Sequence, residues 1–164
     1  MIPPEVYGDC ARRGEKELFL RLRDAPETRD WIVLHSLDIA NHRKQVQGEI
    51  DFVVIVPSKG VLCVEVKACQ QVHRHAGKWS YGAKDTQGDL RGPFKQASEG
   101  MHSLRSRIIA RRPDLSRVIF WSAVVFTHCD FRAQSEEWHP WQVIDSQLFR
   151  SRPILCDPAP RLTS

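Results

Sequence analysis

Residues 48–68, GEIDFVVIVPSKGVLCVEVKA, constrain the fold of this chain more than any other segment. Two runs rich in Val, Ile, Leu and Phe flank the short sequence PSKG, which predicts an antiparallel hairpin of two buried strands. Yet Asp51 lies in the first run, and Glu65 and Lys67 lie near the end of the second. Charged side chains are rarely buried unless they are paired or bind a metal. We therefore expect this hairpin to hold a charged site.

The turn at residues 57–60 decides whether the two carboxylates meet. Side chains alternate along a strand, so Glu65 and Lys67 share one face. An even, unbulged turn sets Asp51 opposite Val66, on the other face from Glu65. An odd loop, or a bulge at Gly60, sets Asp51 opposite Glu65. A shared site therefore requires an odd loop or a bulge at this turn.

Two adjacent carboxylates repel each other unless a proton or a cation lies between them. Mg²⁺ suits such a pair, because it is a hard ion that binds oxygen and uses one or two carboxylates alongside water. The peptide carbonyl of Val66 offers a third oxygen. Lys67 is placed to orient or deprotonate a water, or to stabilise charge on a phosphate. These groups predict a site that hydrolyses phosphodiesters; a buried salt bridge between Lys67 and Glu65 or Asp51 is the alternative.

A first helix is predicted over residues 13–23, RGEKELFLRLR. Leu18 and Leu22 lie four residues apart on one face. Because each residue turns the helix by about 100°, Glu15 falls on the same side while Glu17 points away. Glu15 is therefore the acid that we expect to face inward.

The remaining pattern predicts an α/β domain. Phe94, Ala97 and Met101 begin an amphipathic stripe that predicts a second helix after Gly92-Pro93, ending at Pro113. Strands are predicted over residues 31–40, 49–56, 61–68 and 118–127, with further short strands within 72–81 and 138–144 and a last turn at 145–150. The predicted domain covers residues 13–150, preceded by an irregular lead-in (1–12) and followed by a linker-like tail (151–164).

Positive charge is concentrated late in the chain. Residues 91–117 carry seven basic and two acidic side chains, a local net charge of +5. Such a surface suits a polyanion, although an ordinary solvated helix face has the same composition. The residues expected to contact a nucleic-acid backbone are Arg105, Arg107, Arg111 and Arg112.

The overall composition is typical of a globular protein. The chain has 164 residues, 41% of them apolar and 27% charged, and carries no apolar run long enough to span a bilayer. The N-terminus lacks the apolar core of a signal peptide, so a cytoplasmic protein without membrane contact is expected. Five cysteines without a CxxC pair argue against a zinc framework and a disulfide scaffold.

Several segments together resemble a known family. They are Gly14-Glu15 with the following LFLRL, GEIDFVVI, GVLCVEVKA, GKW, GPFKQA and the late strand VIFWSAVVFT. Over about residues 13–150 this pattern is similar to the NERD (nuclease-related) domain of the PD-(D/E)XK nuclease superfamily. One departure is that Ile50, not proline, precedes Asp51. The resemblance implies a restriction-endonuclease-like core, with a mixed central sheet that contains an antiparallel hairpin and is flanked by helices.

The resemblance also implies roles for individual residues. Asp51 and Glu65 would bind Mg²⁺ or Mn²⁺ and Lys67 would be the catalytic lysine. Glu15 would support the site from its helix, and Gln96 would act near the attacking water or the scissile phosphate. The implied activity is hydrolysis of DNA by a metal-activated water.

Two other functions stay open from the sequence. The first is a non-catalytic nucleic-acid-binding or scaffold module, and the second is a structural domain serving an ATPase. Relatives often join this domain to helicase or kinase modules. The chain contains no GxxxxGK[ST] sequence, so a helicase or ATPase would be a fused or separate partner.

Overall fold

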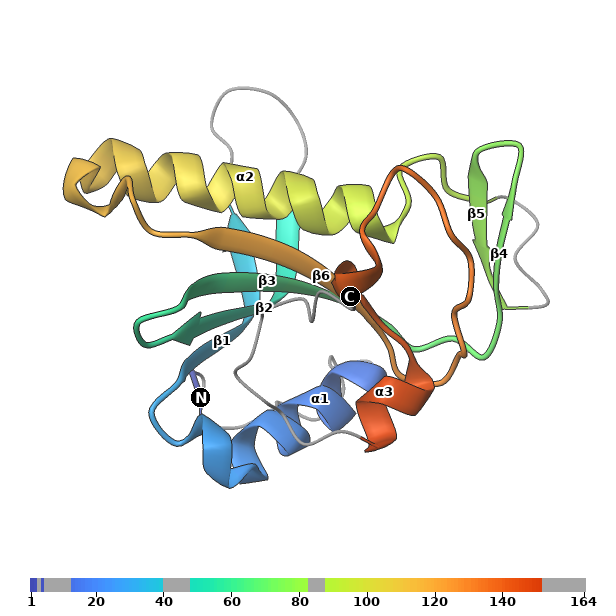
Figure 1. The fold of residues 1–164 in the computed structure, drawn as a ribbon, viewed down its shortest axis with the longest axis horizontal. Coiled ribbons are helices and arrows are strands. Elements are labelled where there is room, and N and C mark those ends of the chain that lie inside the picture. The colour runs from blue at the N-terminus through green and yellow to red at the C-terminus, as the bar shows by residue number, and fades with distance from the viewer. Residues whose placement is uncertain (3, 5–12, 40–47, 83–87, 152–164) are drawn as a thin grey trace, which may run out of the picture.

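The computed structural model describes residues 1–2, 4, 13–39, 48–82 and 88–151. Its elements form a five-stranded sheet and a separate two-stranded hairpin, flanked by helices (Figure 1). The helices are α1 (Arg13–Asp24), α2 (Pro93–Arg111) and α3 (Ser146–Ser151), and the strands are β1 (Ile32–Ile39), β2 (Gly48–Val56), β3 (Gly60–Lys67), β4 (Val72–His75), β5 (Lys78–Tyr81), β6 (Phe120–Phe126) and β7 (Val143–Ile144).

The main sheet is mixed. Its strand order is β1-β2-β3-β6-β7; β1, β2 and β3 pair antiparallel, whereas β6 pairs in parallel with both β3 and β7. Helix α2 lies on one face of this sheet, and α1 and α3 lie on the other (Figure 1). The predicted α/β class and the restriction-endonuclease-like arrangement are thereby confirmed.

The β2–β3 turn has the odd length that the sequence required. Val56 pairs with Gly60, so the loop contains three residues, 57–59. Gly60 has a φ of 138°, and a Cβ on it would lie 2.3 Å from the carbonyl oxygen of Ile119. Only glycine fits this backbone conformation so close to the strand that follows α2. The turn therefore fixes the register on which the charged residues depend.

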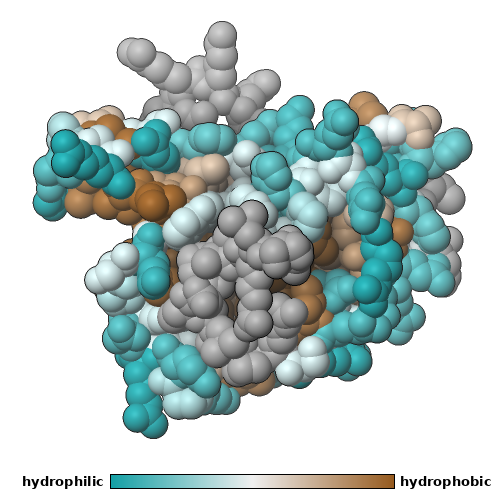
Figure 2. Space-filling model, in the orientation of Figure 1, coloured by the Kyte–Doolittle hydropathy of each residue, from teal (hydrophilic) through white to brown (hydrophobic). Residues whose placement is uncertain are grey.

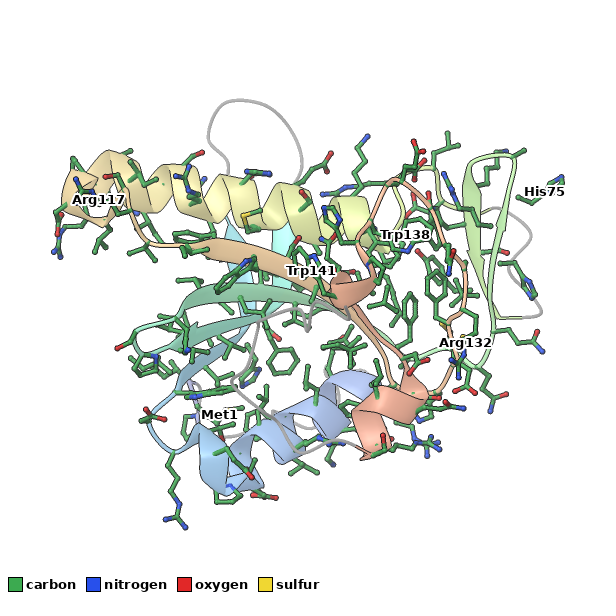
Figure 3. All side chains as sticks on the ribbon, viewed as in Figure 1. Met1, His75, Arg117, Arg132, Trp138 and Trp141 are labelled. Atoms are coloured by element: carbon green, nitrogen blue, oxygen red, sulfur yellow. The ribbon has the colours of Figure 1, made fainter. Side chains whose placement is uncertain are left out.

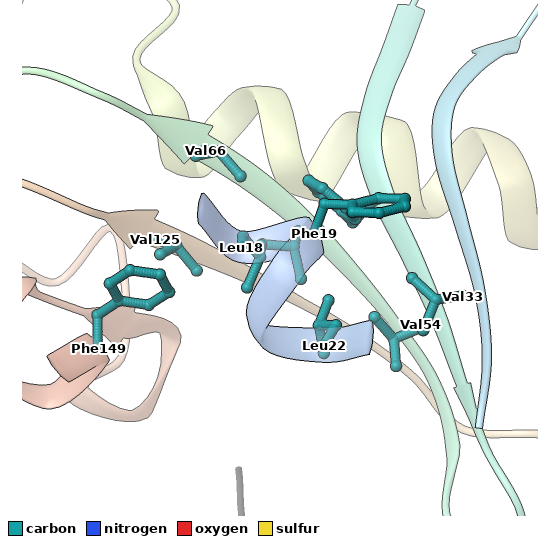
Figure 4. Packing of buried hydrophobic residues seen from close by; sticks show 10 residues of the cluster. Leu18, Phe19, Leu22, Val33, Val54, Val66, Val125 and Phe149 are labelled. Carbon is teal, nitrogen blue, oxygen red and sulfur yellow. The ribbon is translucent and has the colours of Figure 1, made fainter. Parts of the chain in front are cut away.

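Each face of the sheet packs against its own helices. Figure 4 shows Leu18, Phe19 and Leu22 of α1 directed at the valines of the sheet. On the opposite face, apolar residues of β2 and β3 such as Val53 pack with Met101 of α2. The 3.6-residue period of the helices and the two-residue period of the strands thus produce two apolar layers.

Aromatic residues form a third cluster at the end of the sheet where β3 and β6 finish. Trp79 of β5, Phe94 of α2, Phe126 of β6 and Trp138 are all buried in it. The Phe94 and Trp138 rings stack with centroids 4.5 Å apart. This cluster attaches the β4–β5 hairpin to the main domain.

Two predicted short strands differ in detail from the observed elements. Residues 72–81 form a hairpin of their own instead of one more strand, because Ala76 and Gly77 both adopt positive φ and reverse the chain. Within 138–144 only β7 is a strand; a 3-10 turn at Pro140–Gln142 precedes it, where Pro140 has no N–H for a sheet.

The predicted lead-in and tail lie outside the described residues, apart from residues 1–2, 4 and 151. Ile2 is bonded to β1 through its N–H and C=O. Among the described helices, none combines the length and the apolar composition that crossing a membrane requires.

The C-terminal end of α2 extends beyond the β2–β3 turn in the view of Figure 1. Figure 2 shows hydrophilic residues on the outer side of this end and hydrophobic residues on its underside. In this region Leu104, Val118 and Phe120 pack against the cluster of buried residues that contains Val53 and Met101.

Candidate active site

The candidate site lies where strands β2 and β3 stop pairing. The antiparallel ladder ends at Phe52 and Val64, and continuing its register by one residue sets Asp51 opposite Glu65. The backbone N–H of Val66 donates to Asp51 Oδ2 at 2.7 Å. The Asp51 side chain thus accepts the hydrogen bond that a backbone carbonyl accepts elsewhere in the sheet. Asp51 is only 9% exposed, so this charged group lies in the interior of the fold.

Lys67 is held at the centre of the site. Its Nζ donates to Glu65 Oε1 at 2.6 Å and to Gln96 Oε1 at 3.0 Å. The Nζ also lies 5.3 Å from the centre of the Tyr81 ring, within the range of a cation–π contact. The Lys67 and Glu65 side chains are 14% and 12% exposed, so their ion pair is largely shielded from water. Three contacts therefore fix the position of the ammonium group.

Helix α2 brings Gln96 to this point. Its amide nitrogen donates to Asp89 Oδ2 at 3.2 Å, and the other Asp89 oxygen accepts the Arg91 N–H at 2.8 Å. These bonds orient the amide so that its oxygen faces Lys67. Sequence reasoning missed Asp89, for which the signal was weak: an acid in the loop just before Gly92-Pro93. It also missed Tyr81, because the sequence predicts a strand within residues 72–81 but does not indicate which part of the fold this strand contacts.

Helix α1 brings Glu15 close because Gly14 has no side chain. A Cβ on Gly14 would lie 2.7 Å from both Ala68 Cβ and Thr127 Oγ1, at the ends of β3 and β6. The charge of Glu15 acts on Asp51 and raises its pKa. Glu17 instead pairs with Arg13 at 3.2 Å and with His128 at 3.3 Å. Glu15, and not Glu17, therefore faces the charged cluster, as the helix phase predicts.

The surroundings of Asp51 disfavour its charged form. Burial, together with the negative charges of Glu65 and Glu15, raises the pKa of Asp51 from 3.8 to about 7, although the Val66 N–H and Lys67 act in the opposite direction. Among the described residues, Asp51 lies beside a Lys67 ammonium that is already paired with Glu65. An additional cation beside Asp51 and Glu65 would offset the charge of Asp51.

The donor atoms fit a hard divalent ion. In a strand, the N–H and C=O of one residue point to the same side, so the Val66 carbonyl is directed to the side where Asp51 lies. Two carboxylates and one carbonyl match the few protein oxygens that Mg²⁺ takes, with water completing its shell. Among the residues that the structure describes, no group of three or more His, Cys, Asp or Glu is arranged for a metal. Carboxylate and carbonyl oxygens, the donors present here, are ligands that suit Mg²⁺ and Mn²⁺.

The predicted backbone-binding arginines do not join the site. Arg105, Arg107 and Arg111 follow Gln96 by 9 to 15 residues in the same helix, a distance of about 14 to 22 Å at about 1.5 Å per residue. Arg105 donates to the Ser116 carbonyl at 3.5 Å, and Arg112 pairs with Asp114 at 2.7 Å. The basic end of α2 is thus a separate, exposed region on the same helix.

Comparison with known families agrees with this geometry. The model of NERD, the nuclease-related domain, matches residues 11–127. The chain belongs to this family. The matched range of the NERD domain contains Glu15, Asp51, Glu65, Lys67 and Gln96, but not β7, α3 or the loop between β6 and β7. No curated protein and no solved structure matches the chain.

Proposed function

We propose that this NERD domain is a metal-dependent nuclease that hydrolyses phosphodiester bonds of DNA with the help of Mg²⁺ or Mn²⁺. The observation that carries the proposal is the convergence of Asp51, Glu65 and Lys67 at the fork between β2 and β3. A merely structural ion pair needs one acid for one lysine. Here Asp51 lies beside the Lys67–Glu65 pair, and burial and the charge of Glu65 raise the pKa of Asp51 to about 7. A buried carboxylate in addition to such a pair is the expected property of a cation site.

Asp51, Glu65 and the Val66 carbonyl would hold the cation. When bound, the cation supplies positive charge beside the scissile phosphate and activates the attacking water. Glu15 adds negative charge from α1, which strengthens cation binding at Asp51 and Glu65. Proton release from Asp51 accompanies loading of the site, because the carboxylate must ionise to act as a ligand.

Lys67 would stabilise the negative charge that develops on the phosphate. Its ammonium is already fixed by Glu65, Gln96 and Tyr81, so little reorganisation is needed when the substrate binds. Gln96, held by Asp89, keeps the ammonium at the edge of the cluster. The lysine would then exchange part of its contact with Glu65 for a contact with a phosphate oxygen.

The basic end of α2 would hold the DNA backbone at a distance from the reaction. Three of these arginines, Arg105, Arg107 and Arg111, lie on α2 beyond the site, and Arg112 directly follows the helix. All four are expected to contact phosphates without reading the sequence. Such contacts increase affinity and are sensitive to salt.

A second candidate function is a non-catalytic nucleic-acid-binding or scaffold module that serves a helicase or ATPase partner. The observation that favours it is the direct Lys67–Glu65 ion pair at 2.6 Å, which occupies both groups. The two functions differ in the role of the cation: it is required for the first and unnecessary for the second.

The test is incubation of supercoiled and linear DNA with the protein in Mg²⁺, Mn²⁺ or EDTA, beside Glu65→Ala and Asp24→Ala. Asp24 pairs with Arg23 at the exposed end of α1 and serves as the acidic control. We expect cleavage that needs the cation, is lost in Glu65→Ala and is retained in Asp24→Ala. If all three proteins showed the same extent of DNA cleavage with and without the cation, the nuclease proposal would be overturned. DNA binding retained under those conditions would then support the second candidate.

A further inference from the structure

A pocket of about 770 Å³ lies on the flank of α2 that faces β6 and the chain before β7. Four tryptophans line it, and we call it the indole pocket; they are Trp79, Trp121, Trp138 and Trp141. Figure 3 labels Trp138 and Trp141 between α2 and the end of β6. None of these residues belongs to the cluster of acids around Lys67.

Trp141 forms an exposed wall of the pocket. Its side chain is 53% exposed, and the His139 ring stacks on it with centroids 5.5 Å apart and an angle of 11° between the planes. Gln142 fixes the short turn that carries it, because its side chain accepts from the His139 N–H and donates to the Ser122 carbonyl of β6. The indole is therefore a rigid, partly uncovered flat surface, which loses little conformational entropy on binding.

The charges of the pocket are balanced, so they favour an uncharged group over a phosphate. Three basic and three acidic side chains line it: Arg74, Arg91 and Lys95, and Glu99, Glu136 and Glu137. Arg91 pairs with Glu99 at 2.7 Å, and Arg74 pairs with Glu137. Trp79 and Trp138 are buried, so Trp141 supplies the exposed aromatic wall. A pocket with balanced charge and such a wall fits an uncharged planar ring. Nucleobases have this chemistry and stack on aromatic side chains independently of sequence.

The pocket adjoins the candidate active site through one helical turn. Lys95 and Ser98 line the pocket, while Gln96, between them in sequence, bonds to Lys67 on the other flank of α2. A helix with its side chains is about 10–12 Å across. A flexible strand that passes over the start of α2 can therefore reach both places, whereas a base inside a duplex cannot leave its stack without loss of pairing.

We propose that the indole pocket receives an unpaired nucleobase next to the scissile phosphate, so that the substrate class is DNA with a single-stranded segment. This inference rests on the proposed nuclease function. Trp138, Trp141 and the turn that holds them lie beyond residues 11–127, the range that the NERD family model matches, whereas Trp79, Trp121 and the α2 residues of the pocket lie within that range.

The test measures binding without cleavage. A fluorescent oligo-dT and a duplex of the same length are titrated with the full chain in EDTA, followed by fluorescence anisotropy. The proteins compared are wild type, Trp141→Ala, Trp141→Phe and Ile32→Ala, the last removing an exposed apolar side chain from β1 as a matched control. Because Trp141 is exposed, its replacement leaves the buried core intact, and a thermal melt of each variant checks this.

We expect Trp141→Ala to weaken oligo-dT binding about fivefold or more, with Trp141→Phe close to wild type and Ile32→Ala unchanged. Duplex binding should change much less in every variant. Unchanged oligo-dT binding in Trp141→Ala, or an equal loss for duplex, would overturn the proposal. Because no cleavage is measured, this result is independent of the Glu65→Ala test: a protein that binds through Trp141 but never cleaves contradicts only the nuclease function.

Discussion

The domain carries charge in two regions that differ in almost every physical respect. Asp51, Glu65 and Lys67 are nearly buried, contact one another or the backbone, and are held by elements from both faces of the sheet. Arg111 and Arg112 lie at the exposed C-terminal end of α2, where Arg112 pairs with the nearby Asp114. In the first region each charge depends on several buried neighbours, whereas in the second the charges are exposed to solvent.

Burial explains the difference. Charges in a poorly hydrated environment interact strongly, so removal of one leaves the others uncompensated. Exposed charges are screened by water and salt, and their pairs stabilise a protein by little. Substitutions in the two regions should therefore have effects of different size and different salt dependence, and the experiments below follow that order.

The largest effect is expected from Lys67→Met. The change removes the partner of Glu65 and the positive charge nearest to Asp51, and removal of one partner of a buried pair destabilises a protein by about 3 kcal/mol or more. DNA cleavage should fall on the order of 10²–10³-fold. Added Mg²⁺ should raise the melting temperature of this variant more than that of wild type, because the ion replaces the missing positive charge. Arg111→Met, an exposed control, should melt like wild type.

Asp51→Asn should make the protein more stable and inactive. The folded-state pKa of about 7 lies above the usual 3.8, so the folded protein binds the extra proton between about pH 4 and pH 7. Stability therefore falls as the pH rises through this window, and the full penalty is present above pH 7. Asparagine still accepts the Val66 N–H but carries no charge. Urea unfolding in EDTA at pH 8 should show a gain on the order of 2–4 kcal/mol.

The same unfolding experiment at pH 4 provides the internal comparison. Wild type is then protonated at Asp51, and the two proteins should have similar stability. Asp114→Asn is the surface control; Arg112 lowers the pKa of Asp114, so this substitution should bring no gain at pH 8. If the stability of wild type relative to Asp51→Asn rose between pH 4 and pH 7, the raised pKa of Asp51 would be contradicted.

Gly14→Ala should have an intermediate effect. The added methyl would lie 2.7 Å from Ala68 Cβ and Thr127 Oγ1, so α1 must move away from the ends of β3 and β6. Such overpacking destabilises by about 1–3 kcal/mol, and the shift carries Glu15 away from Asp51. We expect a lower melting temperature and weaker Mg²⁺ binding, measured as a higher Mg²⁺ concentration for half-maximal cleavage. Lys16→Ala, on the exposed face of the same helix, should change neither.

The smallest effects are expected from single substitutions in the basic end of α2. Arg107→Gln or Arg111→Gln should weaken DNA binding a few-fold at low salt and reduce the slope of log K against log salt by about 0.9 for each phosphate that the protein no longer neutralises. Arg112→Gln should have less effect, because Asp114 already pairs with that side chain. Binding titrations at several salt concentrations measure both quantities. If one of these substitutions lowered DNA cleavage or stability as much as Lys67→Met, the exposed arginines would not differ from the buried cluster in the way described.

Sequence reasoning reached the candidate site because its signals are local. Asp51 and Glu65 interrupt apolar strands, and the short turn between them limits the possible registers. The phase of Glu15 relative to Leu18 and Leu22 follows from helix geometry alone. Each of these inferences uses residues within one element or one hairpin, where the geometry of the backbone is known in advance.

Contacts between distant segments could not be predicted in this way. The orientation of Gln96 depends on Asp89 in a loop, and the place of Trp138 depends on stacking with Phe94. The indole pocket combines α2, the start of β6 and the turn before β7. No periodicity in the sequence specifies which of these segments meet, because tertiary packing alone decides it.

The three-residue turn between β2 and β3 also limits how this hairpin can vary. One inserted or deleted residue would exchange the two faces of β3 relative to β2, which separates Asp51 from Glu65 while leaving apolar side chains on both faces. Two inserted residues would preserve the faces. Changes in the length of this turn are therefore restricted by parity: odd lengths keep the site, and even lengths preserve a hydrophobic hairpin that has lost its chemistry.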